Sequence, residues 1–158
     1  MTQSSFKEDD KVCILSYNSR GFNGPNIDFM KFLLKKELVG VRIPILCNQE
    51  NFILRENAYK LKNAFPDHQL IINPAVKKDL TLGRPSNGMF IAFPVNIRDQ
   101  VTAVSPGFWR LKAVKIRFKS SLLLINSYFP TDTQRDNADS ADLLNTLGHI
   151  KQIICRGK

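Results

Sequence analysis

The sequence of 158 residues predicts an α+β protein, because two different patterns follow one another along the chain. Up to about residue 66, strand-like and helix-like segments alternate, which is typical of parallel strands joined by helices. After that point, short apolar segments are separated by loops that contain Gly, Pro and Asn, which is typical of antiparallel strands. An amphipathic segment at residues 140–155 predicts a helix after these strands.

The first two strands of the prediction are each followed by a helix. Residues 1–10 are polar and acidic and predict a disordered leader, and residues 11–17 form an apolar run typical of a buried strand. Pro25 opens a helix that extends to about residue 39, with an apolar face made by Ile27, Met30, Leu34 and Leu38. Residues 43–47 predict the second strand and residues 53–65 the second helix. The two strands are expected to run parallel.

The later strands are expected at residues 70–72, 89–93, 101–104, 109–119 and 122–129. In residues 109–119 the alternation of apolar and basic side chains slips by one residue at Ala113 and Val114, so a β-bulge is predicted there. A bulge would leave the basic residues as a solvated stripe, either an ordinary exposed face or one that follows phosphates: Arg110, Lys112, Lys115, Arg117 and Lys119. Asn87 and Gly88 predict a turn before residues 89–93.

Composition favours a polyanionic partner and a reducing compartment. Lysine and arginine number 23 against 14 acidic residues, which gives a net charge of +9 and favours partners such as nucleic acid. Cys13, Cys47 and Cys155 are odd in number and far apart, which indicates an intracellular protein of the cytoplasm or nucleus. We find no run typical of a signal peptide or a membrane span, so neither secretion nor a membrane partner is expected.

Three apolar strands each lead to a polar residue that suits metal or phosphate chemistry, and these are Asn18, Glu50 and Tyr128. Ligands of α/β sheets bind at the carboxyl ends of strands, so these three side chains are expected to converge. Each residue also has an ordinary explanation. Asn18 suits a loop, Glu50 suits the start of a helix, and Tyr128 can be a core tyrosine with its hydroxyl at the surface.

Four motifs in this order resemble a known family. They are Ser-Tyr-Asn-Ser-Arg-Gly at residues 16–21, Gln-Glu at 49–50, the loop 83–88 entering a strand, and Asn-Ser-Tyr-Phe-Pro at 126–130. Together they resemble the first half of the endonuclease/exonuclease/phosphatase superfamily. The motifs are most similar to the endonuclease domain of LINE-type (non-LTR) retrotransposons, which are relatives of the apurinic endonucleases.

The resemblance implies a DNase I-like fold, in which two packed β-sheets are flanked by helices in four layers, α/β/β/α. It implies that residues 11–158 are the N-terminal part of such a domain, with a reverse transcriptase domain in the parent protein. The activity it implies is cleavage of DNA phosphodiesters with Mg²⁺ or Mn²⁺.

The resemblance also implies a role for five residues of this sequence. Glu50 would be a metal ligand, and Asn18 would help to position the metal or the substrate phosphate. Tyr128 would contact the scissile phosphate. Arg110 and Asn126 would bind substrate.

Two motifs of the family's second half, Asp-x-Asn and Ser-Asp-His, do not occur in the 158 residues. His68 and His149 have no adjoining Ser-Asp, so neither corresponds to the family's general acid/base histidine. We therefore expect this chain alone to be a poor catalyst and, with strands lacking neighbours, to aggregate or to be molten. The alternatives are a non-catalytic basic fragment that binds nucleic acid, and a phosphatase or sphingomyelinase of the same fold.

Overall fold

The computed structural model describes residues 11–35, 42–77, 85, 87–104, 108–118, 120–129 and 137–156. The predicted leader and residues 83, 84 and 86 of the predicted loop 83–88 lie outside these residues. In chain order the elements are β1 (Lys11–Asn18), α1 (Gly24–Lys35), β2 (Arg42–Gln49), η1 (Arg55–Asn57), α2 (Ala58–Ala64), β3 (His68–Asn73), β4 (Met89–Pro94), η2 (Val95–Gln100), β5 (Val101–Val104), β6 (Leu111–Arg117), β7 (Ser121–Ser127) and α3 (Asn137–Arg156).

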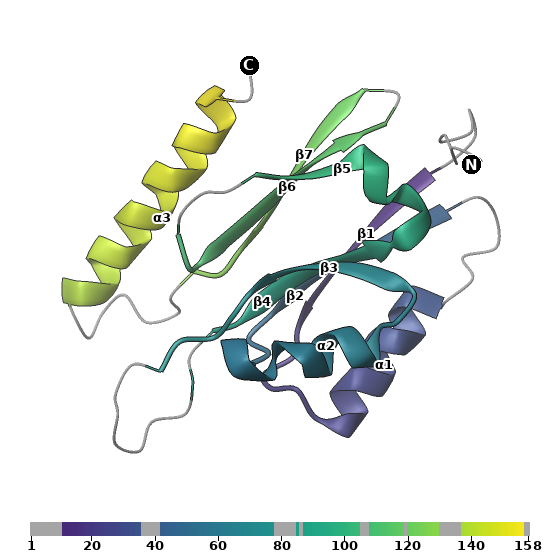
Figure 1. The fold of residues 1–158 in the computed structure, drawn as a ribbon. Helices are drawn as coiled ribbons and strands as arrows, with labels where there is room; N and C mark the ends of the chain where they lie inside the picture. Colours follow the sequence, from purple (N-terminus) through teal and green to yellow (C-terminus); the bar gives the residue numbers. More distant parts are fainter. Residues whose placement is uncertain are drawn as a thin grey trace.

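The first sheet has the strand order β1-β2-β4-β3. β1 and β2 run parallel, as the strand and helix pattern predicts, and β4 is antiparallel to both β2 and β3. Helices α1 and α2 lie on one face of this sheet (Figure 1). The contact is apolar, because Met30 and Leu34 of α1 and Leu61 of α2 pack against Leu46 and Phe90 of the sheet.

The second sheet has the strand order β5-β6-β7, and both of its strand pairs are antiparallel. Helix α3 runs alongside the outer face of this sheet (Figure 1). Its Ile153 packs against Leu111 and Ala113 of β6. The predicted helix of residues 140–155 is therefore confirmed, and it begins three residues earlier than the pattern indicates.

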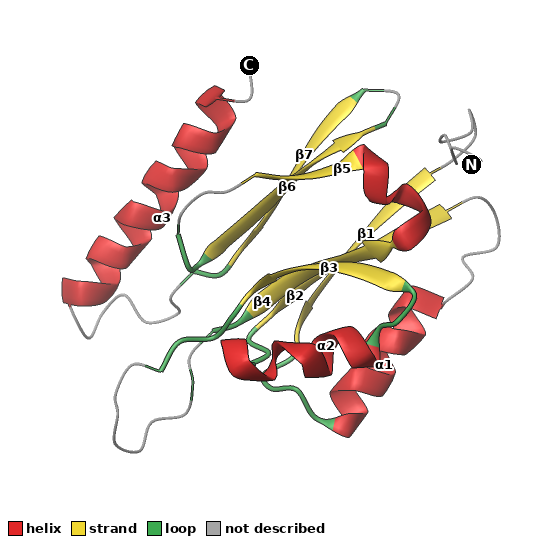
Figure 2. Cartoon of the chain, viewed as in Figure 1, coloured by secondary structure: helices red, strands yellow, loops and turns green. Residues whose placement is uncertain are grey.

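The two sheets face each other across a shared apolar core. Ile45 and Cys47 of β2 and Ile91 of β4 pack against Val114 and Ile116 of β6. Burial in this core raises the pKa of the Cys47 thiol to about 11. The four-layer arrangement, with strands in the middle and helices on both outer sides (Figure 2), confirms the α/β/β/α architecture.

The β-bulge predicted at Ala113 and Val114 is wrong. The register of β6 runs without a break against both β5 and β7, with Ala113 opposite Ile125 and Val114 opposite Leu124. The apolar pattern slips because β6 is buried on both faces. Ala113 faces α3 while Val114 faces the first sheet, so neighbouring residues are both apolar without any bulge.

The prediction that the basic residues 110–119 form one solvated stripe is also wrong. Lys115 and Arg117 are exposed, whereas Lys112 is half-buried and Arg110 is only 3% exposed. Alternation along β6 places Lys112 on the face of Val114 and Ile116, toward the first sheet. Lys119 lies outside the described residues.

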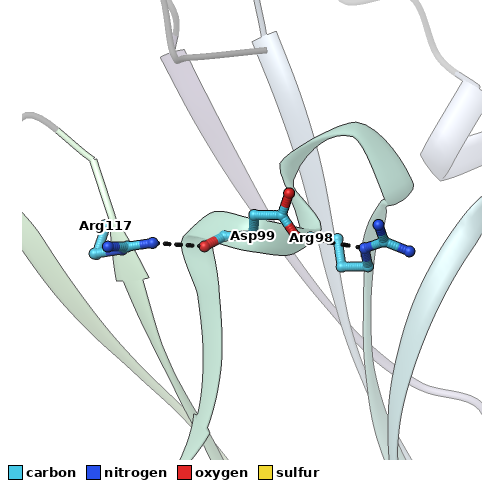
Figure 3. Close-up of polar contacts among 3 residues, drawn as sticks. All are labelled: Arg98, Asp99 and Arg117. Carbon is cyan, nitrogen blue, oxygen red and sulfur yellow. Dashed lines mark hydrogen bonds and ion pairs between the residues drawn. The ribbon is translucent and has the colours of Figure 1, made fainter. Parts of the chain in front are cut away.

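Other element boundaries shift by a few residues. The predicted helix of residues 53–65 is a 3₁₀ turn, η1, followed by the seven residues of α2, because Leu54 forms a bridge with Ala75 instead. The short helix η2 was not predicted from the sequence. Its end is tied to β6, because Arg117 Nη2 donates to the carbonyl oxygen of Asp99 at 2.7 Å, while Arg98 and Asp99 form an exposed ion pair (Figure 3).

Within the described part of the chain, the helices are too short or too polar to cross a membrane.

Candidate functional site

The two sheets are joined at one end by a pair of buried amides. Gln49 is the last residue of β2, and its Nε2 donates to Oδ1 of Asn126 on β7 at 2.7 Å. The Nδ2 group of Asn126 donates to the carbonyl oxygens of Asn48 (3.0 Å) and Phe90 (3.1 Å), which belong to β2 and β4. Asn126 is only 2% exposed. It therefore fixes the end of β7 against the first sheet.

The carboxyl end of β1 lies next to the buried amides of Gln49 and Asn126. Gln49 Nε2 also lies 3.3 Å from Oγ of Ser16, and Asn18 pairs with Gln49 in the parallel register. Along β1, Ser16 and Asn18 alternate with Leu15 and Tyr17, which pack against the core beneath α1. Ser16 and Asn18 therefore lie on the opposite face of the sheet, the face on which Val12 packs against the core between the two sheets. We call Ser16, Asn18, Gln49 and Asn126 the polar end of the sandwich.

Glu50 and Tyr128 both follow directly from the polar end of the sandwich. Glu50 is one residue beyond Gln49, and its carbonyl oxygen accepts from the Gly21 amide at 2.7 Å. Tyr128 is two residues beyond Asn126, and its amide donates to the carbonyl oxygen of Arg110 at 3.0 Å. The strands β1, β2 and β7, from which the predicted residues follow, thus end on the same side of the molecule, away from the N-terminus in Figure 1.

Backbone strain is concentrated around Glu50. In the described part of the chain, four residues other than glycine have a positive φ: Arg20 (48°), Glu50 (55°), Phe52 (59°) and Asn87 (65°). All four lie in loops at this end of the first sheet. Strained backbone of this kind is characteristic of functional sites, where surrounding contacts must hold it in place.

Hydrogen bonds between two loops supply those contacts. The Phe52 amide donates to the carbonyl oxygen of Asn87 at 2.9 Å, and the Asn51 amide to that of Gly88 at 3.1 Å. Gly88 has a φ of 78°, and a Cβ atom at this position would collide with the side chain of Asn51. Asn87 and Gly88, where a turn is predicted, have positive φ values, and their carbonyl oxygens accept from the backbone of residues 51 and 52. These two hydrogen bonds hold the loop that carries Glu50.

Arg110 lies in a group of aromatic rings at the start of β6. Its guanidinium carbon is 4.1 Å from the centroid of the Trp109 ring and 5.8 Å from that of Tyr128. Stacking on Trp109 fixes the orientation of the guanidinium group. The structure thus brings Arg110 and Tyr128, two of the predicted site residues, close to each other.

Asn73 and Asn48, which are not among the predicted site residues, support this arrangement. Asn73 ends β3, and its Nδ2 lies within hydrogen-bonding distance of the carbonyl oxygens of Phe108, Trp109 and Leu111. It therefore holds the turn that presents Arg110. Asn48 is fully buried beneath the site, where its amide donates to the carbonyl oxygen of Tyr17 and accepts from Asn51. An asparagine after an apolar run is a common strand end, so no sequence signal separates these two from others.

The donor set at this end fits a hard divalent cation. Glu50 supplies one carboxylate, which forms no ion pair within the described residues, and Asn18 supplies an exposed amide oxygen that accepts from the Arg20 amide at 3.2 Å. Mg²⁺ needs only one or two protein carboxylates, because water and substrate phosphates complete its coordination. Among the residues that are described, no three His, Cys, Asp or Glu side chains gather closely enough to form a complete metal cage.

A separate hollow of about 210 Å³ lies on the helical side of the first sheet, between the ends of α1 and α2. Leu34 and Phe65 form part of its lining, together with Lys31, Asp67 and His68. Its lining includes no residue of the polar end of the sandwich.

The layers, the strand order and the polar strand ends define the class of fold: an α/β/β/α sandwich of the DNase I-like type. The chain is similar to the crystal structure of the AP endonuclease LMAP from Leishmania major, with a TM-score of 0.53 and 13% sequence identity. The match covers 74% of this chain and 40% of that chain. The chain thus spans less than half of the length of this neighbour, and at this identity the similarity shows the fold.

No family model matches the sequence, and no curated protein matches it.

Proposed function

We propose that this chain is part of a domain that cleaves phosphodiester bonds in DNA with Mg²⁺ or Mn²⁺, and that it derives from a retrotransposon whose protein also carries a reverse transcriptase. The observation that supports it most is the hydrogen bond of 2.7 Å between Gln49 and Asn126. This bond ties the two strand ends from which Glu50 and Tyr128 follow. The similarity in fold to an AP endonuclease and the net charge of +9 also support a DNA substrate.

The residues divide the work by their chemistry. Glu50 and Asn18 would hold the divalent cation, which when bound polarises a phosphate oxygen and balances the charge that develops on it. The Tyr128 hydroxyl would donate a hydrogen bond to the same phosphate. The stacked guanidinium group of Arg110 would contact a phosphate oxygen beside it. Asn126 would position β7 through its hydrogen bonds to the first sheet. Its Oδ1 atom already accepts from Gln49, so a direct contact with substrate would use the second lone pair of this oxygen.

The 158 residues include no Asp-x-Asn and no Ser-Asp-His. We propose that these residues alone bind cation and DNA but cleave poorly, because the group that activates the attacking water is not among them. Loss of such a group costs about a hundred-fold to ten-thousand-fold in rate. The unpaired cysteines Cys13, Cys47 and Cys155 support our further proposal of an intracellular location.

The experiment is a titration of the chain with Mn²⁺, observed as paramagnetic broadening of amide signals. We expect broadening at residues 18–21 and 49–52, and its loss in Glu50→Gln. Glu56→Gln is the matched control, because Glu56 is an exposed glutamate six positions along the chain in η1. Equal broadening in wild type and Glu50→Gln would refute the assignment of the metal ligand.

A second measurement tests the substrate. We expect a short DNA duplex to bind with an affinity that falls steeply with salt, and binding to increase when Mg²⁺ is present. A duplex affinity that changes neither with Mg²⁺ nor in Glu50→Gln would favour the alternative of a non-catalytic fragment that binds nucleic acid. Efficient nicking by the chain, abolished in Glu50→Gln, would contradict the proposed poor cleavage while upholding the metal site.

A further inference from the structure

Lys112 differs from the other lysine of β6, Lys115, in the face of the strand that it occupies. Lys112 stands on the inner face with Val114 and Ile116, which belong to the core between the sheets. Its partner across the antiparallel register is Asn126. Directly opposite residues in such a pair have Cβ atoms about 5 Å apart. A lysine therefore borders the polar end of the sandwich from within the second sheet.

Among the residues that the structure describes, the ammonium group of Lys112 forms no ion pair. Lys112 is half-buried, and within the described residues no ion pair or hydrogen bond joins its side chain. Burial lowers the pKa of Lys112, because desolvation disfavours the charged form. Lys115, by contrast, is exposed to solvent. A partly desolvated cation without a carboxylate partner is unfavourable in the folded protein unless an anion binds beside it.

We propose that Lys112 is a phosphate-binding residue, whose ammonium group contacts a backbone phosphate of the DNA beside the one that Tyr128 and Arg110 contact. This assignment rests on the proposed function, and it adds a residue that the motifs do not include. Lysine suits the task because its flexible stem delivers a point charge to a phosphate oxygen. The position beside Asn126 gives the site two cationic side chains, Arg110 and Lys112, from one strand and the turn that precedes it.

The test compares wild type with Lys112→Met, and Lys115→Met is the matched control because it removes the same charge from the exposed face of the same strand. Affinity for a short DNA duplex is measured over a range of salt concentrations. We expect the slope of log affinity against log salt to fall by about 0.9 in Lys112→Met, as for one lost phosphate contact, and to change little in Lys115→Met. Equal slopes for Lys112→Met and wild type would overturn the proposal.

A second readout separates binding from structure. We expect Lys112→Met to melt at the same temperature as wild type or higher, because the change removes a half-buried charge that forms no ion pair with any described residue. The opposite result would be a large drop in melting temperature, together with a loss of duplex affinity that only matches the unfolded fraction. That result would show a structural role for Lys112 and overturn the proposal.

The last readout does not depend on DNA or on a variant. In wild type with ¹³C-labelled lysine, inorganic phosphate is titrated and the Cε signals are followed. We expect the Lys112 signal to shift at lower phosphate concentration than the Lys115 signal. If the chain binds no duplex, the proposed function fails, and a selective shift of Lys112 still upholds the anion site. Identical shifts at both lysines would refute the anion site even if duplex binding is strong.

Discussion

At the scale of single residues, Asn126 joins the two sheets through its side-chain amide. Its amide uses one acceptor and two donors to join β7 to β2 and β4. A buried hydrogen bond contributes about 1 kcal/mol, and an unpaired buried partner costs more. The residue predicted to bind substrate therefore also holds the two sheets together.

The first prediction concerns the stability that this amide confers. We expect Asn126→Ala to lower the free energy of unfolding by about 2–4 kcal/mol, because three hydrogen bonds are lost and their partners stay buried. Urea denaturation followed by circular dichroism measures it. Asn63→Ala, at an exposed position of α2, is the control and should change the free energy by less than about 0.5 kcal/mol. A loss below 1 kcal/mol in Asn126→Ala, on the order of a single bond, would contradict the three-way role.

The second prediction concerns pH. Burial lowers the pKa of His68 from its ordinary value of 6.5, although the neighbouring Asp67 acts in the opposite direction. The fold therefore favours the neutral imidazole. Its contribution to stability is complete above pH 6.5 and is lost as the pH falls through the lowered pKa of the folded state. We expect His68→Gln to flatten the acid side of the stability profile, measured by urea denaturation at several pH values. An unchanged profile would show that other groups carry the acid dependence.

The residues that could be predicted from sequence are those at strand ends. Asn18, Glu50 and Tyr128 each stand at the end of an apolar run. Asn18 and Glu50 belong to one edge of the first sheet, where neighbouring strand ends meet. Tyr128 follows β7 of the second sheet, so its place near them depends on how the two sheets stack. Gln49 and Asn73 could not be predicted in this way, because their roles depend on contacts with strands 36 to 77 residues away. A side chain that bonds across two sheets leaves no local pattern.

At the scale of secondary-structure elements, β6 explains where the sequence was misleading. Alternation predicts which side chains share a face, but it does not state how many faces are buried. By alternation alone the apolar pair Ala113 and Val114 predicts a bulge, whereas α3 and the first sheet cover opposite faces of one regular strand. Pro25 and Pro66 indicate the start of α1 and the end of α2 to within a residue or two, whereas no residue of this kind marks the start of α2.

The third prediction concerns the contact between β4 and the helices. Phe90 is fully buried, and its ring centroid lies 5.8 Å from that of Phe65. We expect Phe90→Ala to lower the free energy of unfolding by about 3–5 kcal/mol, because it leaves a cavity beneath α1 and α2. Tyr59→Ala is the control, since this aromatic residue of α2 is 56% exposed. Similar losses for both variants in thermal or urea unfolding would contradict the position of the core.

At the scale of the whole molecule, the edge strands of the two described sheets each pair with only one neighbouring strand. β1 and β7 are such edges, and they belong to different sheets. Ile14 of β1 is 45% exposed although its neighbours Val12 and Ser16 on the same face contact the core or the site. An open edge with an exposed apolar side chain favours pairing with other chains.

The fourth prediction is that the chain self-associates through the β1 edge. We expect Ile14→Lys to increase the monomer fraction, because charged residues on an edge strand oppose strand pairing. Size-exclusion chromatography with light scattering measures it over a range of concentrations. Leu144→Lys is the control, because Leu144 is an exposed apolar residue on α3 and not on a strand. An equal effect of both substitutions would indicate general solubility rather than pairing at the edge.

The class of fold could be predicted from sequence because each sheet has its own local pattern. A parallel pair with intervening helices and a run of short antiparallel strands can each be recognised from periodicity and turn residues. The way in which the two sheets stack is set by side chains such as Val114 and Ile91, which are distant in the chain. The α/β/β/α order of layers is therefore predicted by the resemblance to the superfamily and not by the local sequence patterns.

The amide pair that joins the sheets has a consequence for the kinetics of folding. Gln49 and Asn126 are 77 positions apart, so their bond closes a long loop whose entropy must be lost before the contact can form. The neighbouring strands β1 and β2 and their connecting helix require a much shorter closure. We therefore expect the polar end of the sandwich to be assembled in the last stage of folding, so that Mn²⁺ binding in a stopped-flow refolding experiment would lag behind the recovery of helical signal.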